Sequence, residues 1–437
     1  MKRSALCLTL VPCLASICPG QVLPLQAPRP DQQSEAPLYL PLHPPSSDAQ
    51  SGLLGAERFD FYPRLAAGLL YNDNVTLRRD PTFGDLIGVI SPGLTFIAGE
   101  TAGSRMGDPA IRSSTLTLES GRVTSAANRA LVTSSPGASV DYAAGFNFFA
   151  EHPALNSIDH AARILLAYPF PRLSLRLQQN VEALSESPVD VGTRVGHRTY
   201  QTLFDTSYSF SELTSFQGAF NQTISDYDLG IGRREWQVSG FANYAFTPMT
   251  TAGAGVTLGL LSPDGLPTQY YEQARLRAGY ELTEFMHLEA SAGLELRQFG
   301  GARSDALNPV FDISGTYSPT ERTAFTLSAS RGSQSSVVLE AQNYTDTTVT
   351  LALRQQIMSP VSGVMMASYH NLSYSATVTG IQSSRNDDHY LLRVGVNVAV
   401  ATRIFVEGFY QMRRNISNET AFDYSNNQTG VALSWEY

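Results

Sequence analysis

Cysteine, lysine and long apolar runs are what this chain of 437 residues largely lacks. All three cysteines, Cys7, Cys13 and Cys18, precede residue 20, so a protein cleaved there has no thiol for disulfides, zinc–thiolate sites or nucleophilic catalysis. No run of about eighteen apolar residues follows this start, which excludes helical membrane spans. A membrane β-barrel or a soluble all-β protein remains.

Positive charge is also scarce, because Lys2 is the only lysine and the formal net charge is −9. Losing Lys2 and Arg3 with a leader makes the chain more negative by two charges. Such a chain has no basic patch to neutralise phosphates, and we exclude nucleic acid as a partner.

Catalytic and metal-binding patterns are missing as well. The seven histidines show no ligand spacing. Glu289 and Glu295 are roughly 20 Å apart along one strand, too far for paired acid–base catalysis. The acidic loop at residues 72–74 could hold calcium, although turn-forming Asn and Asp explain it more simply. We therefore expect no enzyme activity, no metal and no cofactor.

The first 57 residues differ from the rest. Residues 1–20 combine a short basic start with an apolar stretch and a small residue, which predicts an export signal peptide. Lipid attachment at Cys18 is a weaker alternative, because Ile17 before it is a poor fit. Residues 21–57 are rich in proline and predict a disordered periplasmic arm. Residues 58–437 form the remaining domain.

This domain alternates apolar and polar residues in segments of about nine to fifteen residues, the length that crosses a bilayer at a tilt. Eighteen such segments predict an all-β fold, a transmembrane antiparallel up-and-down β-barrel of about eighteen strands. Residues 99–137 are long for a periplasmic turn and contain a possible extra strand at 111–120. Sixteen or twenty strands therefore remain alternatives.

The connections sort by length. From Tyr168 onward, tight turns such as 247–248 and 359–360 alternate with longer polar connections such as 334–344 and 417–426. Short turns on one rim and long loops on the other are typical of outer-membrane barrels, whose short rim faces the periplasm. A soluble sandwich has no reason to sort its loops in this way.

The two faces of each segment indicate which side contacts lipid and which side lines the water-filled lumen. Residues 427–437 alternate up to a terminal aromatic, as a closing strand does, and we expect this strand to engage the barrel-assembly machinery. A charge facing lipid near the midplane costs about 2 to 4 kcal/mol, so the charged face must line the lumen. The candidate lumen or constriction residues are Arg176, Arg275, Arg277, Glu281, Glu289, Glu295, Arg297, Arg393, Glu407 and Arg413.

These charges have two interpretations. Opposed Arg and Glu side chains can create a transverse field that sorts polar solutes at a constriction. They can also be structural pairs that satisfy one another between strands, which we favour, and both can hold together. Aromatics near the segment ends predict girdles at the headgroups, with outer-membrane lipid and lipopolysaccharide as partners.

Several stretches resemble a family of β-barrel porins of Gram-negative bacteria, the beta-barrel porin 2 type, associated with exopolysaccharide or exosortase gene clusters. The similarity runs from about Phe59 to Tyr437, and residues 99–137 depart from it. It is carried by residues 71–74, 90–94, 149–160, 191–194, 225–227, 233–236, 297–299, 329–331 and 342–344. The resemblance implies an outer-membrane porin-like protein with no catalytic residues.

We therefore expect an outer-membrane channel of a Gram-negative bacterium that passes polar, sugar-like solutes. The resemblance adds a role as a conduit in surface polysaccharide export, with polysaccharide-export components as partners. The alternative is a plugged barrel that acts as a surface adhesion or scaffold protein through its long loops.

Overall fold

A computed structural model describes residues 59–99, 114–117, 122–125, 136–186, 194–283, 285–300, 305–320, 322–379 and 384–436. The expected signal peptide and periplasmic arm lie outside the described residues, as do most of the suggested strand at 111–120 and the terminal Tyr437.

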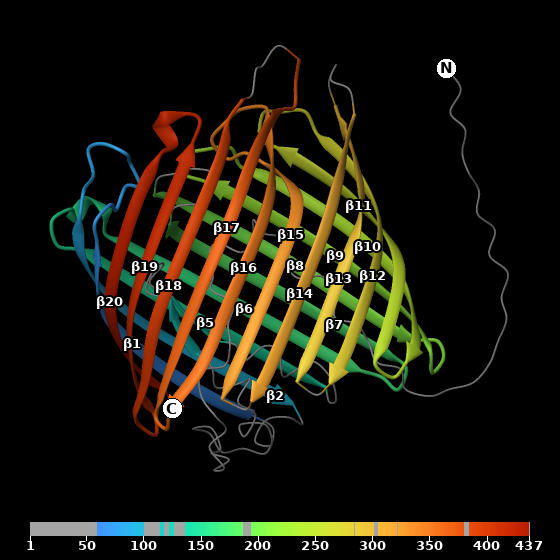
Figure 1. The fold of residues 1–437 in the computed structure, drawn as a ribbon, viewed down its shortest axis with the longest axis horizontal. Coiled ribbons are helices and arrows are strands. Elements are labelled where there is room, and N and C mark those ends of the chain that lie inside the picture. The colour runs from blue at the N-terminus through green and yellow to red at the C-terminus, as the bar shows by residue number, and fades with distance from the viewer. Residues whose placement is uncertain are drawn as a thin grey trace.

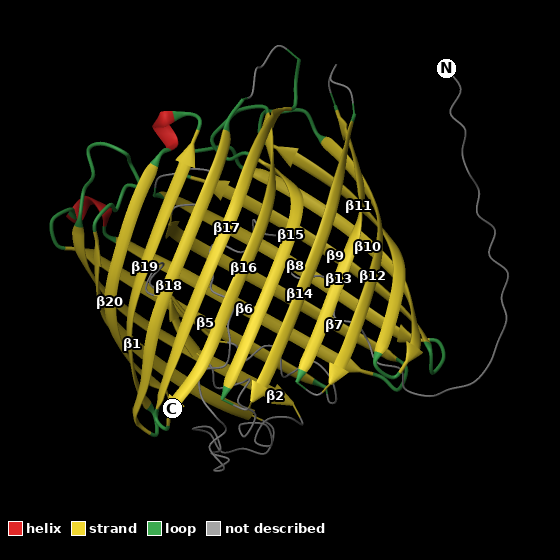
Figure 2. Ribbon diagram, viewed as in Figure 1, coloured by secondary structure: helices red, strands yellow, loops and turns green. Residues whose placement is uncertain are grey.

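Strands make up most of the described chain (Figure 2). They are β1 Phe59–Asn72, β2 Asp85–Gly99, β3 Ser114–Thr117, β4 Arg122–Ser125, β5 Gly137–Phe149, β6 Ser157–Pro169, β7 Leu173–Glu186, β8 Val195–Ser209, β9 Thr214–Tyr227, β10 Arg233–Thr247, β11 Thr250–Pro263, β12 Gln269–Thr283, β13 Met286–Phe299, β14 Ala306–Thr320, β15 Thr323–Ser335, β16 Gln342–Met358, β17 Val361–Ala376, β18 Asn386–Ala401, β19 Ile404–Ser417 and β20 Tyr424–Glu436. Two short 3-10 helices, η4 Pro153–Leu155 and η5 Thr420–Phe422, lie in loops.

Eighteen strands form one closed antiparallel barrel (Figure 1). Each barrel strand pairs with its neighbours in sequence, β2 pairs with β5, and β1 pairs with β20 to close the cylinder. The predicted fold and strand number are confirmed. The suggested extra strand does not join the wall: β3 and β4 form a separate two-stranded sheet inserted between β2 and β5. None of the helices in the described ranges has the length and apolarity to span a membrane.

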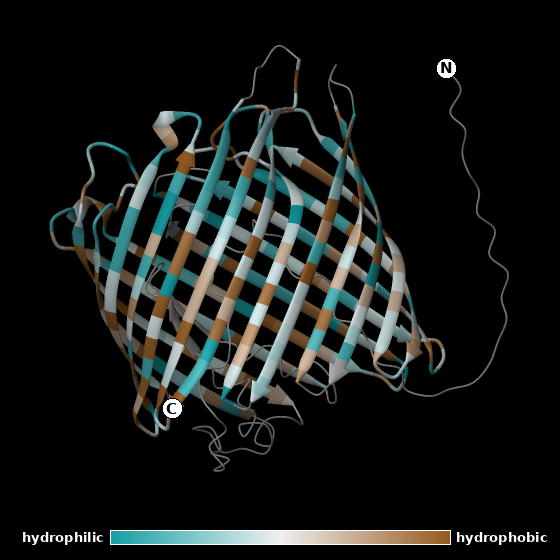
Figure 3. Ribbon diagram, in the orientation of Figure 1, coloured by the Kyte–Doolittle hydropathy of each residue, from teal (hydrophilic) through white to brown (hydrophobic). Residues whose placement is uncertain are grey.

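The strand pleat separates two surfaces, since successive side chains of a strand point to opposite faces. On β13, Leu294 is 53% exposed on the outside, while its neighbour Glu295 and then Arg297 are 1% exposed on the inside. The alternating colours along the strands in Figure 3 repeat this pattern around the wall. Large exposed aromatics such as Phe170, Phe246 and Tyr317 gather at the tight-turn rim.

Connections of the two rims differ as predicted, with tight turns and the C-terminal end at one rim (Figure 1). The strands extend further toward the other rim than the sequence indicated. In particular, the supposed long polar connection at 334–344 is wrong. There β15 continues to Ser335, β16 begins at Gln342, and the short link between them is apolar at Val337, Val338 and Leu339.

Candidate functional site

The inner wall carries the polar residues that the sequence singled out. All ten lie at inward positions, alternating along their strands with outward-facing residues. Arg275, Arg277, Glu295, Arg297, Arg393, Glu407 and Arg413 are buried, whereas Arg176 and Glu289 are partly exposed. Glu281 is about half exposed at the tight-turn end of β12, near His287.

The structure brings most of these residues together in small groups. Arg393 on β18 pairs with Glu407 on β19, with its Nη2 3.0 Å from the Glu407 Oε1. Arg176 on β7 pairs with Asp205 on β8. Arg275 on β12 reaches across β13 to Asp312 on β14. These pairs satisfy buried charges, as the structural interpretation requires, on the face that lines the lumen.

Arg277 is different because it donates its side-chain hydrogen bonds to amides rather than to acids. It donates from Nε to Asn243 at 2.7 Å and from Nη2 to Gln217, on β10 and β9. Neutral acceptors leave the guanidinium charge uncancelled by direct pairing. The acid with which this charge interacts electrostatically is Glu289, on the neighbouring strand β13.

Three inner-wall arginines place their guanidinium groups over aromatic rings, and each ring lies over a glycine. The guanidinium carbons of Arg277, Arg297 and Arg393 are 4.1, 4.8 and 4.1 Å from the ring centroids. A Cβ on the underlying glycine would come within 2.7 Å of ring atoms in every case. The stacks are Gly255, Phe241 and Arg277; Gly259, Tyr271 and Arg297; and Gly430, Phe409 and Arg393. Sequence reasoning missed them, although the inward glycines of β11 at alternate positions were a usable signal.

The outer end of β15 separates from its neighbour β14 after Arg331, whereas β16 stays paired with β17 along its whole length. We call residues 332–343 the inward hairpin. Its Ser335 carbonyl accepts a hydrogen bond of 3.3 Å from Arg233 Nη1 on β10, and its Val337 carbonyl accepts one of 2.7 Å from the Ile231 N–H. β10 and β15 are five strand positions apart, about 24 Å along the wall. Because the hydrogen bonds are this short, the hairpin must extend through the barrel interior from β15 to the region of β10 instead of following the wall.

Two further contacts hold the base of the inward hairpin. Gln269 on β12 and Asn343 exchange hydrogen bonds of 3.2 and 2.7 Å. Arg297 Nη2 donates to the Ser333 carbonyl at 3.4 Å, while its Nε donates to Glu295 at 2.9 Å. The candidate pair of Arg297 and Glu295 therefore lies directly under the hairpin.

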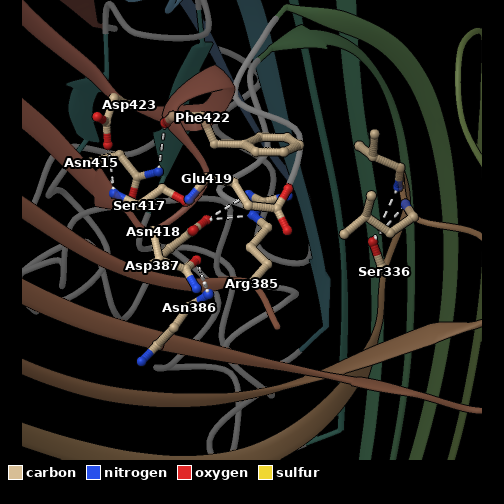
Figure 4. Close-up of polar contacts among 12 residues, drawn as sticks. Ser336, Arg385, Asn386, Asp387, Asn415, Ser417, Asn418, Glu419, Phe422 and Asp423 are labelled. Atoms are coloured by element: carbon tan, nitrogen blue, oxygen red, sulfur yellow. Dashed lines mark hydrogen bonds and ion pairs between the residues drawn. The ribbon is translucent and has the colours of Figure 1, made fainter. Parts of the chain in front are cut away.

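Apolar side chains at the tip complete its attachment. Val337, 4% exposed, packs with Val195 of β8 and Tyr227 of β9. On the opposite side, Leu339 packs against a cluster from β16 and β17. The Ser336 hydroxyl accepts the N–H groups of Val338 and Leu339 at 3.3 and 2.9 Å, which fixes the turn (Figure 4).

A second loop, residues 73–84, also turns inward. Val75 is buried in a cluster with inner-wall residues that include Leu70, Ile87 and Phe149. The Asp73 carboxylate accepts the N–H and the side-chain amide of Asn427 at 2.6 and 2.8 Å, which joins β1 to β20. These contacts support the turn interpretation of this acidic loop. Across the described ranges, no group of three or more His, Cys, Asp or Glu residues could hold a metal ion.

Arg385, just before β18, connects the loops at this end of the barrel through contacts with Tyr374, Phe422 and Asp387. Its guanidinium carbon lies 3.4 Å from the Phe422 ring centroid and 4.4 Å from that of Tyr374, and its Nε and Nη2 bond to Asp387 at 2.9 and 2.5 Å. Figure 4 shows this arginine beneath Phe422. Asn418 bonds to the Ser384 carbonyl, so the β17–β18 and β19–β20 loops are tied together. Sequence reasoning had assigned no role to Arg385.

An apolar exterior, a charged interior and a closed ring of strands define a porin-type membrane β-barrel. The family model described as "Putative beta-barrel porin 2" matches residues 201–437. The chain belongs to this family, which confirms the resemblance seen in the sequence.

Solved structures with a similar course of the chain include Pseudomonas aeruginosa OccK3 (OpdO), at 12% identity and a TM-score of 0.42, covering 86% of this chain and 96% of that one. The outer membrane protein OpdK of P. aeruginosa matches at 12% identity and a TM-score of 0.41, with 86% and 99% covered. Acinetobacter baumannii OccAB4 matches at 10% identity and a TM-score of 0.45, with 87% and 99% covered. No curated protein matches the chain.

Proposed function

We propose that this barrel is an outer-membrane channel of a Gram-negative bacterium that passes polar, sugar-like solutes and serves as a conduit in surface polysaccharide export. The observation that carries the proposal is the contrast between the two faces of the wall. Leu294 and its outward neighbours suit lipid, whereas buried pairs such as Arg393 and Glu407 suit a polar passage. The predicted export signal and closing strand support the outer-membrane location.

Conductance of the purified barrel in planar bilayers tests the channel. A steady single-channel current is expected, and liposome-swelling assays with sugars of graded size then measure what passes. Swelling that is faster with salts or amino acids than with sugars of equal size would contradict the sugar-like cargo.

The second candidate is a closed barrel that acts as a surface scaffold or adhesion protein. It is favoured by the inward hairpin and the loop at 73–84, which both occupy the mouth. Electrical silence in bilayers, together with a correctly folded barrel by circular dichroism, supports this candidate over the channel.

A further inference from the structure

The direction of the backbone amides explains why the inward hairpin leaves the wall. Ser318 N donates to the Phe285 carbonyl at 2.7 Å, next to β13, and the register of β14 with β13 is unbroken from Tyr317 back to Ala306. Amides of an antiparallel strand alternate between its two neighbours. The odd-numbered residues of β14 therefore direct their N–H and C=O groups toward β15.

Pro309 interrupts that side of the strand. The ladder between β14 and β15 reaches Phe311 paired with Arg331 and stops there. The next rung in the same register would pair Pro309 with Ser333, and proline has no N–H to donate. Beyond this point β15 curves away from β14 (Figure 1).

On β15, the carbonyls that would accept hydrogen bonds from β14 accept them from other donors instead. Ser336 N donates to the Gln342 carbonyl at 3.0 Å, so even-numbered residues of this strand face β16 and the odd-numbered Ser333 and Ser335 face β14. The Ser333 and Ser335 carbonyls accept from Arg297 and Arg233. Two guanidinium groups, from β13 and β10, thus take the place of the β14 amides as donors.

We infer that the inward hairpin is the constriction that limits solute size in the proposed channel, and that Arg233 and Arg297 are the positioning residues that hold it there. This inference rests on the proposed transport function. Pro309 weakens the attachment of β15 to the wall, the two arginines stabilise the crossing position, and Val337 anchors the tip against Val195. A solute that crosses the channel must pass beside the inward hairpin.

The test compares two variants with the wild-type protein. The first is Arg233→Ala combined with Arg297→Ala. The second replaces residues 337–341 with Asn-Gly, which keeps the rung between Ser336 and Gln342 and supplies a two-residue hairpin turn. Both are expected to raise single-channel conductance severalfold and to admit larger sugars in liposome swelling. Arg176→Ala is the control, because Arg176 lines the same lumen but pairs with Asp205 between β7 and β8 rather than with the hairpin.

The outcomes separate the two ideas. A conducting wild type whose size limit is unchanged in both folded variants overturns the constriction and leaves the channel standing. A silent wild type that begins to conduct in either variant supports the constriction and overturns the resting open channel. An equal rise in the size limit for Arg176→Ala contradicts the assignment, because a loss of lumenal charge alone would then explain it.

Discussion

Single inner-wall glycines decide how the arginines of the lumen lie. A strand position without a side chain lets the ring of the neighbouring strand lie flat, and the flat ring in turn supports a guanidinium. Gly259 shows this most clearly, since a Cβ there would lie 1.9 Å from Cζ of Tyr271. The same ring donates its hydroxyl to Glu235 at 2.5 Å. One glycine therefore positions a tyrosine, a carboxylate and Arg297.

We expect Gly259→Val to displace Tyr271 and to lower the free energy of unfolding by about 1 to 3 kcal/mol, the usual effect of overpacking. Denaturant titration of the barrel in lipid vesicles measures this change. Gly240→Val is the control for a strand glycine outside the stacks, since Gly240 lies on the outward face of β10 and a Cβ there meets nothing within 4 Å. Equal loss of stability in both variants would show that strand glycines are sensitive in general and that the stack contributes nothing special.

The sequence predicted which side chains face inward, but not what they touch. Two-residue alternation places Arg277 and Glu295 on the charged face without knowledge of any neighbour. The partners of Arg277 lie 34 and 60 residues away, at Asn243 and Gln217. Such contacts depend on the register between strands, which alternation within one strand does not fix.

At the scale of the strand, position along the bilayer normal decides what a substitution costs. Leu276, 69% exposed in the middle of β12, faces outward near the expected midplane, whereas Val400, 63% exposed, lies at the tight-turn end of β18. Leu276→Arg is expected to lower the free energy of unfolding in vesicles by about 2 to 4 kcal/mol and Val400→Arg by only about 0 to 1 kcal/mol. Similar costs at the two depths would contradict the assignment of the outer face to lipid.

Pro309 of β14 is expected to control how closely β15 lies to the wall at the mouth of the barrel. Pro309→Thr restores the N–H that the rung with Ser333 needs, so we expect β15 to lie closer to the wall and the conductance to rise. Hydrogen exchange of residue 309 and bilayer recordings measure the two effects. Pro92→Thr is the control, because Pro92 lies in a similar gap of the ladder between β2 and β5, far along the strand order from the hairpin. A rise in conductance for Pro92→Thr but not for Pro309→Thr would refute this role of β14.

For the whole molecule, the sequence predicted the number of barrel strands, their up-and-down order and the two rims, because each follows from local alternation and connection length. It did not predict the inward hairpin. That feature depends on Arg233 meeting Ser335 across 102 residues of sequence, and on a proline whose effect appears only when its neighbour strand is known. The alternation of short and long connections predicted a long polar loop at 334–344, and the apolar residues Val337 and Leu339 within it were overlooked.

Closure of the cylinder depends on the first and last strands meeting, and Asp73 sits at that seam. Its carboxylate bonds to the backbone and side-chain amides of Asn427, 354 residues away, while Asn72 accepts the side-chain amide of Asn426 at 2.6 Å. Because hydrogen bonds to a charged group are each worth about 1.5 to 3 kcal/mol, we expect Asp73→Ala to lower the free energy of unfolding by about that much or more.

The seam joins residues 354 positions apart in the sequence, so its formation requires the two ends of the barrel domain to meet. We therefore expect Asp73→Ala to slow the appearance of the folded, heat-modifiable band when the unfolded barrel is diluted into vesicles. Asp80→Ala is the control, because Asp80 is an exposed carboxylate of the same loop. The two variants differ only in whether the lost charge joined β1 to β20. If Asp73→Ala folds as fast as Asp80→Ala and is equally stable, the paired strand backbones alone close the barrel, and residues 72–74 serve the loop rather than the seam.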